Sequence, residues 1–363
     1  MQRSTTLEVR KHALADTRLS ERDLPTLGNG EVLARVDRFA LTANNITYGV
    51  VGEKIGYWRF FPAADGWGVI PVWGFADVVE SRHPDVPVGE RLYGYFPMGT
   101  HLVLRPVAIK PERLVDGAPH RSALPQVYNS YARVSAEPQH DPALDDERML
   151  LFPLYATSFC LYDFLSDNRW FGAQQVVIVS ASSKTALGLA LALADDETSP
   201  PAVALTSRKN LAWVSGLGLY SGAYDYDDLD AIDAATPTVI VDMSGNGTVL
   251  SALHARLGDT MRHCANVGIT HYDETAMGAG FIAERSAMFF APAHIQKRTA
   301  EWGPGVFQLK AFEFWRQAAV RSRAWLRMER LAGLDGLQTA YRQVLGGAIS
   351  PDRGVIVDLQ GSG

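Results

Sequence analysis

A turn rich in hydroxyl side chains joins an apolar strand to an apolar helix near the middle of this sequence of 363 residues. Val176–Ser180 is short, apolar and β-branched, as in strands buried on both faces, and Ser183–Ala194 then changes to helix formers. A buried strand, a tight turn and an apolar helix form the opening unit of a dinucleotide-binding domain. Its G-x-G-x-x-G frame would fall on Ser183, Thr185 and Gly188, so only the last glycine is present.

This turn supports two interpretations. Small hydroxyl residues can offer O–H groups as well as backbone N–H groups to a phosphate at a helix N-terminus, and the last glycine allows close packing of helix and strand. An ordinary βα unit of a parallel sheet would show the same pattern. Under the first interpretation, the candidate pyrophosphate contacts are Ser182, Ser183, Lys184, Thr185 and Gly188.

The next apolar run, Ala202–Thr206, is followed by residues that favour a phosphate over a ribose hydroxyl. NAD recognition usually places Asp or Glu at the end of this second strand, whereas here Ser207, Arg208 and Lys209 follow. Hydroxyls, an arginine fork and a lysine charge fit a 2′-phosphate, so the stretch favours NADP(H) as cofactor. The alternative is the solvated basic start of a surface helix.

The surrounding pattern predicts the elements that position these residues. Strand and helix signals alternate after residue 145, which is typical of an α/β fold with a parallel sheet covered on both faces. The expected strands are Val176–Ser180, Ala202–Thr206, Thr238–Met243 and Cys264–Ile269, with helices at Arg208–Leu217 and Thr248–Leu257. A long amphipathic helix is expected over Lys310–Arg330, and a final strand over Val355–Leu359.

Residues 1–145 have the spacing of a small antiparallel barrel, because short strand signals alternate with Gly, Asn and Pro turns. The expected strands are Thr6–Val9, Val32–Phe39, Trp73–Val79, Arg91–Tyr93 and His101–Leu104. Thr42–Pro62, rich in polar and aromatic residues, is expected to be a loop beside a pocket, and Ser135–Glu147 a boundary linker.

Composition narrows the class of protein. The net charge of −6 gives no reason to expect nucleic acid or an anionic membrane as a partner. No apolar run reaches the roughly 18 residues of a spanning helix, and the first residues lack the apolar core of a signal peptide. We therefore expect a cytoplasmic protein whose two cysteines, Cys160 and Cys264, are buried thiols.

Several motifs, in the same order along the chain, resemble the medium-chain dehydrogenase/reductase superfamily, and within it the zinc-independent, quinone-oxidoreductase-like branch. They are Gly30–Val36 (GEVLARV), Val88–Gly94 (VGERLYG), Phe152–Ser158, Thr206–Asn210 with Gly216–Gly218 and Tyr224–Tyr226, Val241–Gly245 (VDMSG) and Gly346–Leu359. The resemblance covers nearly the whole chain, although each motif is degenerate.

The resemblance implies a Rossmann doubly wound parallel sheet plus a GroES-like β-barrel domain. The GroES-like catalytic domain would comprise residues 1–145, completed by 323–363, and the Rossmann domain residues 146–322. It also implies a cleft that holds NAD(P)H, a small-molecule substrate and a homodimer. Further cofactor contacts would be Ser244 and Gly245 after one strand, and Gly268 and Thr270 near the nicotinamide amide.

No catalytic zinc is expected. Zinc enzymes of the superfamily bind the metal through Cys and His in the first domain, but residues 1–145 contain no cysteine, and the stretch that resembles the metal-binding segment begins Trp73-Gly74. The histidines of this region, His83, His101, His120 and His140, lack ligand spacing. They are interpreted as surface or structural residues.

In zinc-free relatives, a tyrosine, an asparagine or water beside the first long strand orients the substrate carbonyl. The corresponding candidates here are Asn45, Tyr48 and Tyr57, with Tyr128 in a second polar-aromatic cluster, Tyr128–Tyr131. A tyrosine hydroxyl is a hydrogen-bond donor at neutral pH and can pass a proton. The alternative for each tyrosine is simple packing with a satisfied hydroxyl.

A last candidate is the aromatic and then basic stretch from Phe289, with His294, Lys297 and Arg298. It is expected to be a loop that closes the cleft or meets phosphate, or else an interface between subunits.

Together these observations predict a zinc-independent, NADP(H)-dependent oxidoreductase that acts on a small carbonyl, quinone or enone. Two alternatives stay open. One is a lyase or isomerase that retains its cofactor without net redox chemistry. The other is a non-catalytic NADP(H)-binding protein, which the missing turn glycines would allow.

Overall fold

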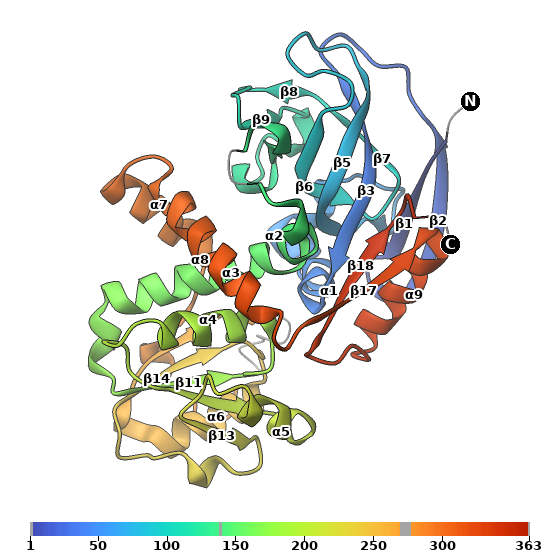
Figure 1. Cartoon of the computed structure of the whole chain (residues 1–363). Helices are drawn as coiled ribbons and strands as arrows, with labels where there is room; N and C mark the ends of the chain where they lie inside the picture. Colours follow the sequence, from blue (N-terminus) through green and yellow to red (C-terminus); the bar gives the residue numbers. More distant parts are fainter. Residues whose placement is uncertain (1–2, 138–139, 269–276, 362–363) are drawn as a thin grey trace. The chain divides into compact units, whose positions relative to one another are not determined.

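The computed structural model describes residues 3–137, 140–268 and 277–361. These residues form two compact units, Met1–Leu150 with Leu326–Gly363 (unit 1) and Leu151–Trp325 (unit 2) (Figure 1). The domain limits expected from the sequence, 145/146 and 322/323, stay a prediction.

Unit 2 is built on a six-stranded sheet in which every pairing is parallel. Its strands are β11 (Gln175–Val179), β12 (Ala202–Thr206), β13 (Gly222–Asp225), β14 (Thr238–Asp242), β15 (Met261–Asn266) and β16 (Ser286–Met288). Their order is β13-β12-β11-β14-β15-β16, so the chain moves outward from β11 in one direction and then returns to β14 on its other side. This is the doubly wound order of a Rossmann fold, and the predicted fold class is confirmed.

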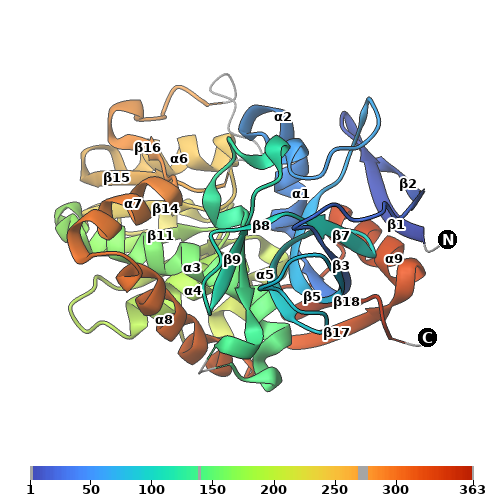
Figure 2. The ribbon, with the colours of Figure 1, turned by 90° about the horizontal axis from the view of Figure 1, so that it is seen from above.

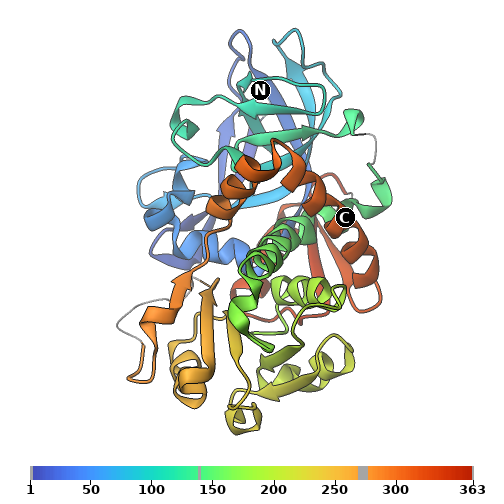
Figure 3. The same cartoon turned by 90° about the vertical axis from the view of Figure 1, so that its left-hand side faces the viewer.

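Helices cover both faces of this sheet because its strands are apolar on both faces. They are α3 (Asp145–Asp167), α4 (Lys184–Ala194), α5 (Arg208–Gly216) and α6 (Gly247–Leu257). Two further helices, α7 (Ala291–Trp302) and α8 (Val306–Ser322), pack with α3 in a separate apolar cluster. Val176 and Ile178 of β11 pack with α3 and α4, whereas Val177 and Val179 pack with α6. Helices α3 and α4 lie next to each other (Figure 3).

Helix α3 is apolar, and its segment Pro142–Asp167 is long and hydrophobic enough to cross a membrane by length and composition alone. Half of the apolar window is buried inside the protein, and core helices of soluble proteins pass the same test. Leu161 and Leu165 of α3 belong to the core under the sheet. We therefore treat α3 as a core helix.

Unit 1 is mainly antiparallel, as the turn spacing predicts. Its strands are β1 (Arg3–Arg10), β2 (Ala13–Asp23), β3 (Val32–Leu41), β4 (Trp67–Gly68), β5 (Pro71–Ser81), β6 (Arg91–Pro97), β7 (His101–Leu104), β8 (Pro106–Val107), β9 (Arg113–Asp116), β10 (Ser130–Arg133), β17 (Arg327–Ala332) and β18 (Arg353–Asp358). Its helices are α1 (Ala43–Val50), α2 (Gly52–Ile55) and α9 (Gly333–Leu345), with a 3₁₀ turn, η1, at Tyr57–Arg59.

The C-terminal segment from Leu326 belongs to unit 1. Strand β18 pairs antiparallel with β3 and parallel with β17 (Figure 2). Leu337 and Tyr341 of α9 lie in the same core cluster as Val36 of β3. The two ends of the chain therefore complete one core.

Three sequence predictions are wrong in detail, and one strand was not predicted. Thr42–Pro62 is not a loop but α1, α2 and η1, because Thr42 and Asn45 form a capping box that starts α1. The helix expected over Lys310–Arg330 stops at Ser322, and its last residues form β17 because β18 offers a parallel partner. The basic stretch after Phe289 is helix α7, with a proline in its first turn, rather than a loop. Strand β2 was missed because it is an exposed, charged edge strand without apolar alternation.

Candidate functional site

The carboxyl ends of β11, β12 and β14 meet at one edge of the six-stranded sheet. Val179 is the register partner of Leu205 on one side and of Asp242 on the other. The stretches 180–185, 207–209 and 243–245 follow these strand ends directly. Ligands of open α/β sheets bind at this edge, where the strand order reverses. The candidate cofactor residues of these stretches thus share one edge.

The turn after β11 replaces glycine with serine. Ser180 adopts a left-handed conformation with φ of 61°, which a residue with a side chain rarely takes. Ser183 is the N-cap of α4, and its hydroxyl accepts a hydrogen bond from the Ala186 amide at 3.3 Å. The hydroxyl therefore satisfies one amide of the first turn, and the amides of Lys184 and Thr185 precede it at the same helix end.

Ser182 links this turn to the next one. Its hydroxyl accepts a hydrogen bond of 3.0 Å from Nδ2 of Asn210, which lies in the first turn of α5. The loops after β11 and β12 are therefore held together by side chains.

Gly188 serves helix packing. A Cβ at this position would lie 2.5 Å from the Ser158 hydroxyl and 2.6 Å from a ring carbon of Tyr155, both on α3. The Ser158 hydroxyl also donates to the Thr185 carbonyl at 2.7 Å. Gly188 was expected to allow close packing of the helix against the strand. In the structure it allows close packing of α4 against α3.

The end of β12 carries the residues that predict NADP(H). Thr206 is almost fully buried, and its hydroxyl has no hydrogen-bond partner among the described residues. Ser207 is the N-cap of α5, but its side chain makes no capping bond. Lys209 is exposed.

Arg208 has carboxylate partners that the sequence analysis missed. Its guanidinium side chain is 75% exposed and forms ion pairs with Asp225 at 3.1 Å and Asp227 at 3.2 Å. Asp225 ends β13, directly opposite Thr206 in the parallel register, and Arg208 helps to lower its pKa, after a hydrogen bond from the Asp227 amide. The signal was present in the sequence as the Asp-Tyr-Asp run, but only the register brings it to Arg208.

The end of β14 is organised by Asp242. This buried carboxylate accepts hydrogen bonds from the amides of Ser244 at 2.8 Å and Gly245 at 3.1 Å, while burial raises its pKa. A Cβ at Gly268 would lie 2.6 Å from the Met243 carbonyl oxygen, so the chain after β15 passes close to this turn. Thr270 lies outside the described residues.

In unit 1, helix α1 places the first two candidates for chemistry. Asn45 is occupied locally, because its Oδ1 accepts from the Thr42 amide at 2.8 Å and its Nδ2 donates to the Pro71 carbonyl at 2.9 Å. Tyr48 is buried, and its hydroxyl accepts from Nδ2 of Asn44 at 2.8 Å. Asn45 thus positions α1, whereas Tyr48 retains a proton to donate.

Tyr48, Tyr57 and Tyr128 come together although 80 residues separate the first from the last. The rings of Tyr48 and Tyr57 lie 4.4 Å apart, and the hydroxyls of Tyr57 and Tyr128 are 3.2 Å apart. Burial is the main cause that raises the pKa of all three hydroxyls. They are therefore protonated donors at neutral pH rather than bases.

Two members of this aromatic cluster were missed. Trp73 of β5 and Tyr95 of β6 are register partners, and their rings lie 5.1 Å apart. Both lie beside the Tyr48 hydroxyl and act to lower its pKa against the larger effect of burial. Neither the Trp73 Nε1 nor the Tyr95 hydroxyl has a hydrogen-bond partner of good geometry among the described residues. The available signal was weak, because Trp73 begins one predicted strand whereas Tyr95 lies two residues beyond the predicted strand Arg91–Tyr93.

The rest of the Tyr128–Tyr131 cluster surrounds a buried arginine that the sequence did not reveal. Arg121 is 1% exposed and donates to Asp116 at 2.7 Å, to Asn129 at 2.9 Å and to the Tyr131 hydroxyl at 3.0 Å. A fourth bond of 2.9 Å reaches the Tyr128 carbonyl. Arg121 therefore fixes the backbone that carries Tyr128.

The basic residues of α7 face carboxylates instead of a phosphate. His294 and Arg298 contact Asp163 at 2.5 Å and 2.6 Å, and Lys297 pairs with Asp167. Both carboxylates lie on α3, and these partners lower the pKa of each. This network ties α7 to α3 within unit 2.

Two further sequence expectations concern metals and thiols. Within residues 3–137, 140–268 and 277–361, no group of three or more His, Cys, Asp or Glu side chains could hold a metal ion. Cys160 and Cys264 are buried free thiols, as predicted, and burial raises the pKa of each.

Comparison with protein-family models gives one match, over residues 39–350, to a family described as a protein of unknown function (DUF2855). No curated protein matches the sequence significantly.

Solved structures resemble the whole chain. CurA from Vibrio vulnificus in complex with NADPH has a TM-score of 0.65 at 14% identity and covers 99% of this chain and 100% of its own. The CurK enoyl reductase has a TM-score of 0.61 at 12% identity, with coverage of 98% and 99%. TarJ from S. aureus in complex with NADPH has a TM-score of 0.60 at 9% identity, with coverage of 98% and 99%. This chain therefore shares its two-part fold with CurA, CurK and TarJ.

Proposed function

This chain belongs to the DUF2855 family, whose description names no activity, and we propose its function from its own residues. We infer that it is a zinc-independent, NADP(H)-dependent oxidoreductase that reduces a small carbonyl, quinone or enone. The observation that carries the proposal is the carboxyl edge of the parallel sheet. There the turn between β11 and α4 is joined to the first turn of α5 by the hydrogen bond between Ser182 and Asn210, at the point of strand reversal. CurA and TarJ, which share the fold, were crystallised with NADPH.

The assigned roles follow from the chemistry of each group. The amides at the N-terminus of α4 would bind the pyrophosphate, and Ser207, Arg208 and Lys209 the 2′-phosphate. Ser244, Gly245, Gly268 and Thr270 are assigned to the nicotinamide end of the cofactor. Bound NADPH supplies a hydride to the substrate.

The tyrosine hydroxyls are assigned to the substrate oxygen. Tyr48, Tyr57 and Tyr128 stay protonated because burial raises their pKa values, so they can donate hydrogen bonds where negative charge develops. Asn45 acts as a positioning residue for Tyr48 through the start of α1. Assembly as a homodimer and a cytoplasmic location stay predictions.

Calorimetric titration with NADPH and NADH, followed by NADPH oxidation at 340 nm with an enone, a quinone and an aldehyde, tests the proposal. We expect tighter binding of NADPH and its stoichiometric loss with at least one substrate class. Negligible binding of both nucleotides would contradict the proposal. So would substrate conversion without loss of NADPH, which indicates a lyase or isomerase, or NADPH binding without any turnover, which indicates a binding protein.

A further inference from the structure

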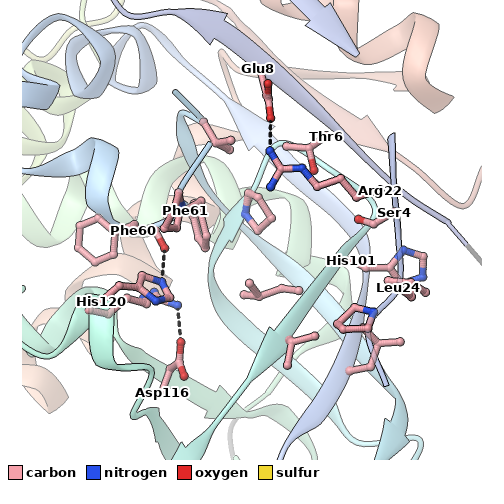
Figure 4. Close-up of a pocket in the computed structure, with 18 of the residues that line it drawn as sticks. Ser4, Thr6, Glu8, Arg22, Leu24, Phe60, Phe61, His101, Asp116 and His120 are labelled. Atoms are coloured by element: carbon pink, nitrogen blue, oxygen red, sulfur yellow. Dashed lines mark hydrogen bonds and ion pairs between the residues drawn. The ribbon is translucent and has the colours of Figure 1, made fainter. Parts of the chain in front are cut away.

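A cavity of about 290 Å³ lies within unit 1 (Figure 4). Its lining comes from β1, the end of β2, the residues after η1, and β7 with the chain that follows it. This volume is at the low end of the range for small-molecule pockets, which is about 300–1,000 Å³.

The walls of this cavity are mostly apolar. Phe60 and Phe61 form one side, and Leu24, Leu102 and Val103 lie among the other lining residues. The Phe60 ring also packs against Tyr95 at 5.2 Å and Tyr128 at 5.6 Å between ring centroids. One wall of the cavity is therefore a rigid aromatic surface, which favours a flat apolar occupant.

The charged side chains that line the cavity are already compensated. Buried Glu8 accepts from Arg22 at 2.7 Å and from Arg18 at 2.6 Å. Asp116 pairs with Arg121 at 2.7 Å. The remaining lining carboxylate, Asp23, lies 3.6 Å from Arg3. Each lining carboxylate therefore already has an arginine partner, and an ionic ligand would lose its hydration on entering the cavity.

Polar groups at the cavity offer hydrogen bonds without charge. His120 Nε2 lies 3.2 Å from the Phe60 carbonyl, which can only accept, so Nε2 is the donor of this hydrogen bond. Burial, and secondarily Arg35, lowers the pKa of His101, so that this ring is neutral at pH 7. Ser4 and Thr6 add hydroxyls.

We propose that this cavity binds a small neutral molecule with a flat apolar body and one hydroxyl or carbonyl group. The site is independent of the proposed redox function, because its occupancy requires no nucleotide.

Calorimetric titration of the full chain, without nucleotide, tests the site with three matched probes: 2-naphthol, naphthalene-2-sulfonate and 2-(aminomethyl)naphthalene. We expect saturable 1:1 binding of 2-naphthol and at least tenfold weaker binding of both charged probes. Leu24→Trp, which adds bulk at the lining, should weaken 2-naphthol at least tenfold. Val88→Trp is the matched control, because Val88 is 62% exposed and does not line the cavity.

Val103→Trp is a second variant that fills the cavity. If circular dichroism shows that Leu24→Trp does not fold, the binding of 2-naphthol is tested with Val103→Trp instead. Absence of 2-naphthol binding would overturn the proposal. Equal binding by the wild type and the filling variants would place the probe elsewhere and would also overturn it. A charged probe that binds as tightly as 2-naphthol would refute the neutral character of the site.

Discussion

The carboxyl edge of the sheet in unit 2 and the aromatic cluster of unit 1 are built in opposite ways. At the edge, the candidate groups are backbone amides, short hydroxyl side chains and the exposed Arg208 and Lys209. In the cluster, the hydroxyls of Tyr48, Tyr95 and Tyr128 are buried among rings, and burial raises their pKa values.

Because of this contrast, we expect substitutions in the two regions to have different effects, on ligand affinity in the first and on protein stability in the second. Arg208 and Lys209 at the edge are exposed to solvent, so their removal should change ligand affinity while leaving the fold intact. Groups in and around the cluster are desolvated, and their removal leaves unpaired partners in the core. The following experiments test this separation, beginning with the largest expected effect.

Arg121→Ala should lower the free energy of unfolding by about 3–5 kcal/mol, because it leaves the Asp116 carboxylate buried without its counter-ion. Urea unfolding measures the loss. Arg105→Ala is the control: its side chain is 54% exposed and pairs with Glu31, so the change should stay below about 1 kcal/mol. A similar small loss for both variants would mean that the buried arginine does not organise the cluster.

Arg208→Ala should weaken NADPH binding about 10- to 100-fold, the equivalent of about 1.5–3 kcal/mol for hydrogen bonds to a charged group. Affinity for NADH and the melting temperature should stay unchanged, because the side chain is 75% exposed. Arg262→Ala is the control, since this exposed arginine lies at the amino end of β15. Equal effects on NADPH and NADH would remove Arg208 from the phosphate site.

Gly188→Ala should destabilise the protein by about 1–3 kcal/mol, because the added Cβ would overlap Ser158 and Tyr155 on α3. Thermal and urea unfolding measure the loss. Gly216→Ala provides the comparison, because nothing lies within 4 Å of a Cβ built there at the end of α5. Stability of Gly188→Ala equal to that of Gly216→Ala would show that the two helices do not need this close approach.

Alkaline pH should destabilise unit 1. The pKa values of Tyr48, Tyr57 and Tyr128 are raised above the value of about 10 for an unfolded tyrosine. The unfolded chain therefore loses protons first, so stability is complete below about pH 10 and then falls by about 1.4 kcal/mol per pH unit for each buried tyrosine. Urea unfolding between pH 8 and 11 measures this slope, and Tyr57→Phe should make it shallower. An unchanged slope in that variant would argue against a buried Tyr57.

Tyr95→Phe should change the free energy of unfolding little, because its hydroxyl makes no hydrogen bond of good geometry to the described residues. Tyr131→Phe is the matched comparison: its hydroxyl donates to the Tyr95 carbonyl at 2.7 Å and accepts from Arg121, so its removal should cost about 1–3 kcal/mol. A larger loss for Tyr95→Phe would indicate a structural role for that hydroxyl.

The local sequence pattern was sufficient to predict those strands and helices whose limits depend on neighbouring residues. The buried β-branched run at Val176–Ser180 predicted β11 to within one residue, and the serine before Lys184 marked the start of α4. Thr42–Pro62 was misread because its polar and aromatic composition hid the capping pair of Thr42 and Asn45. The helix expected to continue to Arg330 failed because its last residues gain strand pairing with β18.

The sequence by itself determined the parallel sheet, the hydroxyl-rich turn after β11 and the absence of a carboxylate at the end of β12. These features depend only on consecutive residues and on the spacing of apolar runs. Only the tertiary structure decided that Asp225 would pair with Arg208, that the hydroxyls of Tyr128 and Tyr57 would meet, and that Arg121 would be buried. The physical reason is that strand register and core packing bring together side chains that are distant in the sequence. Patterns of neighbouring residues do not predict such contacts.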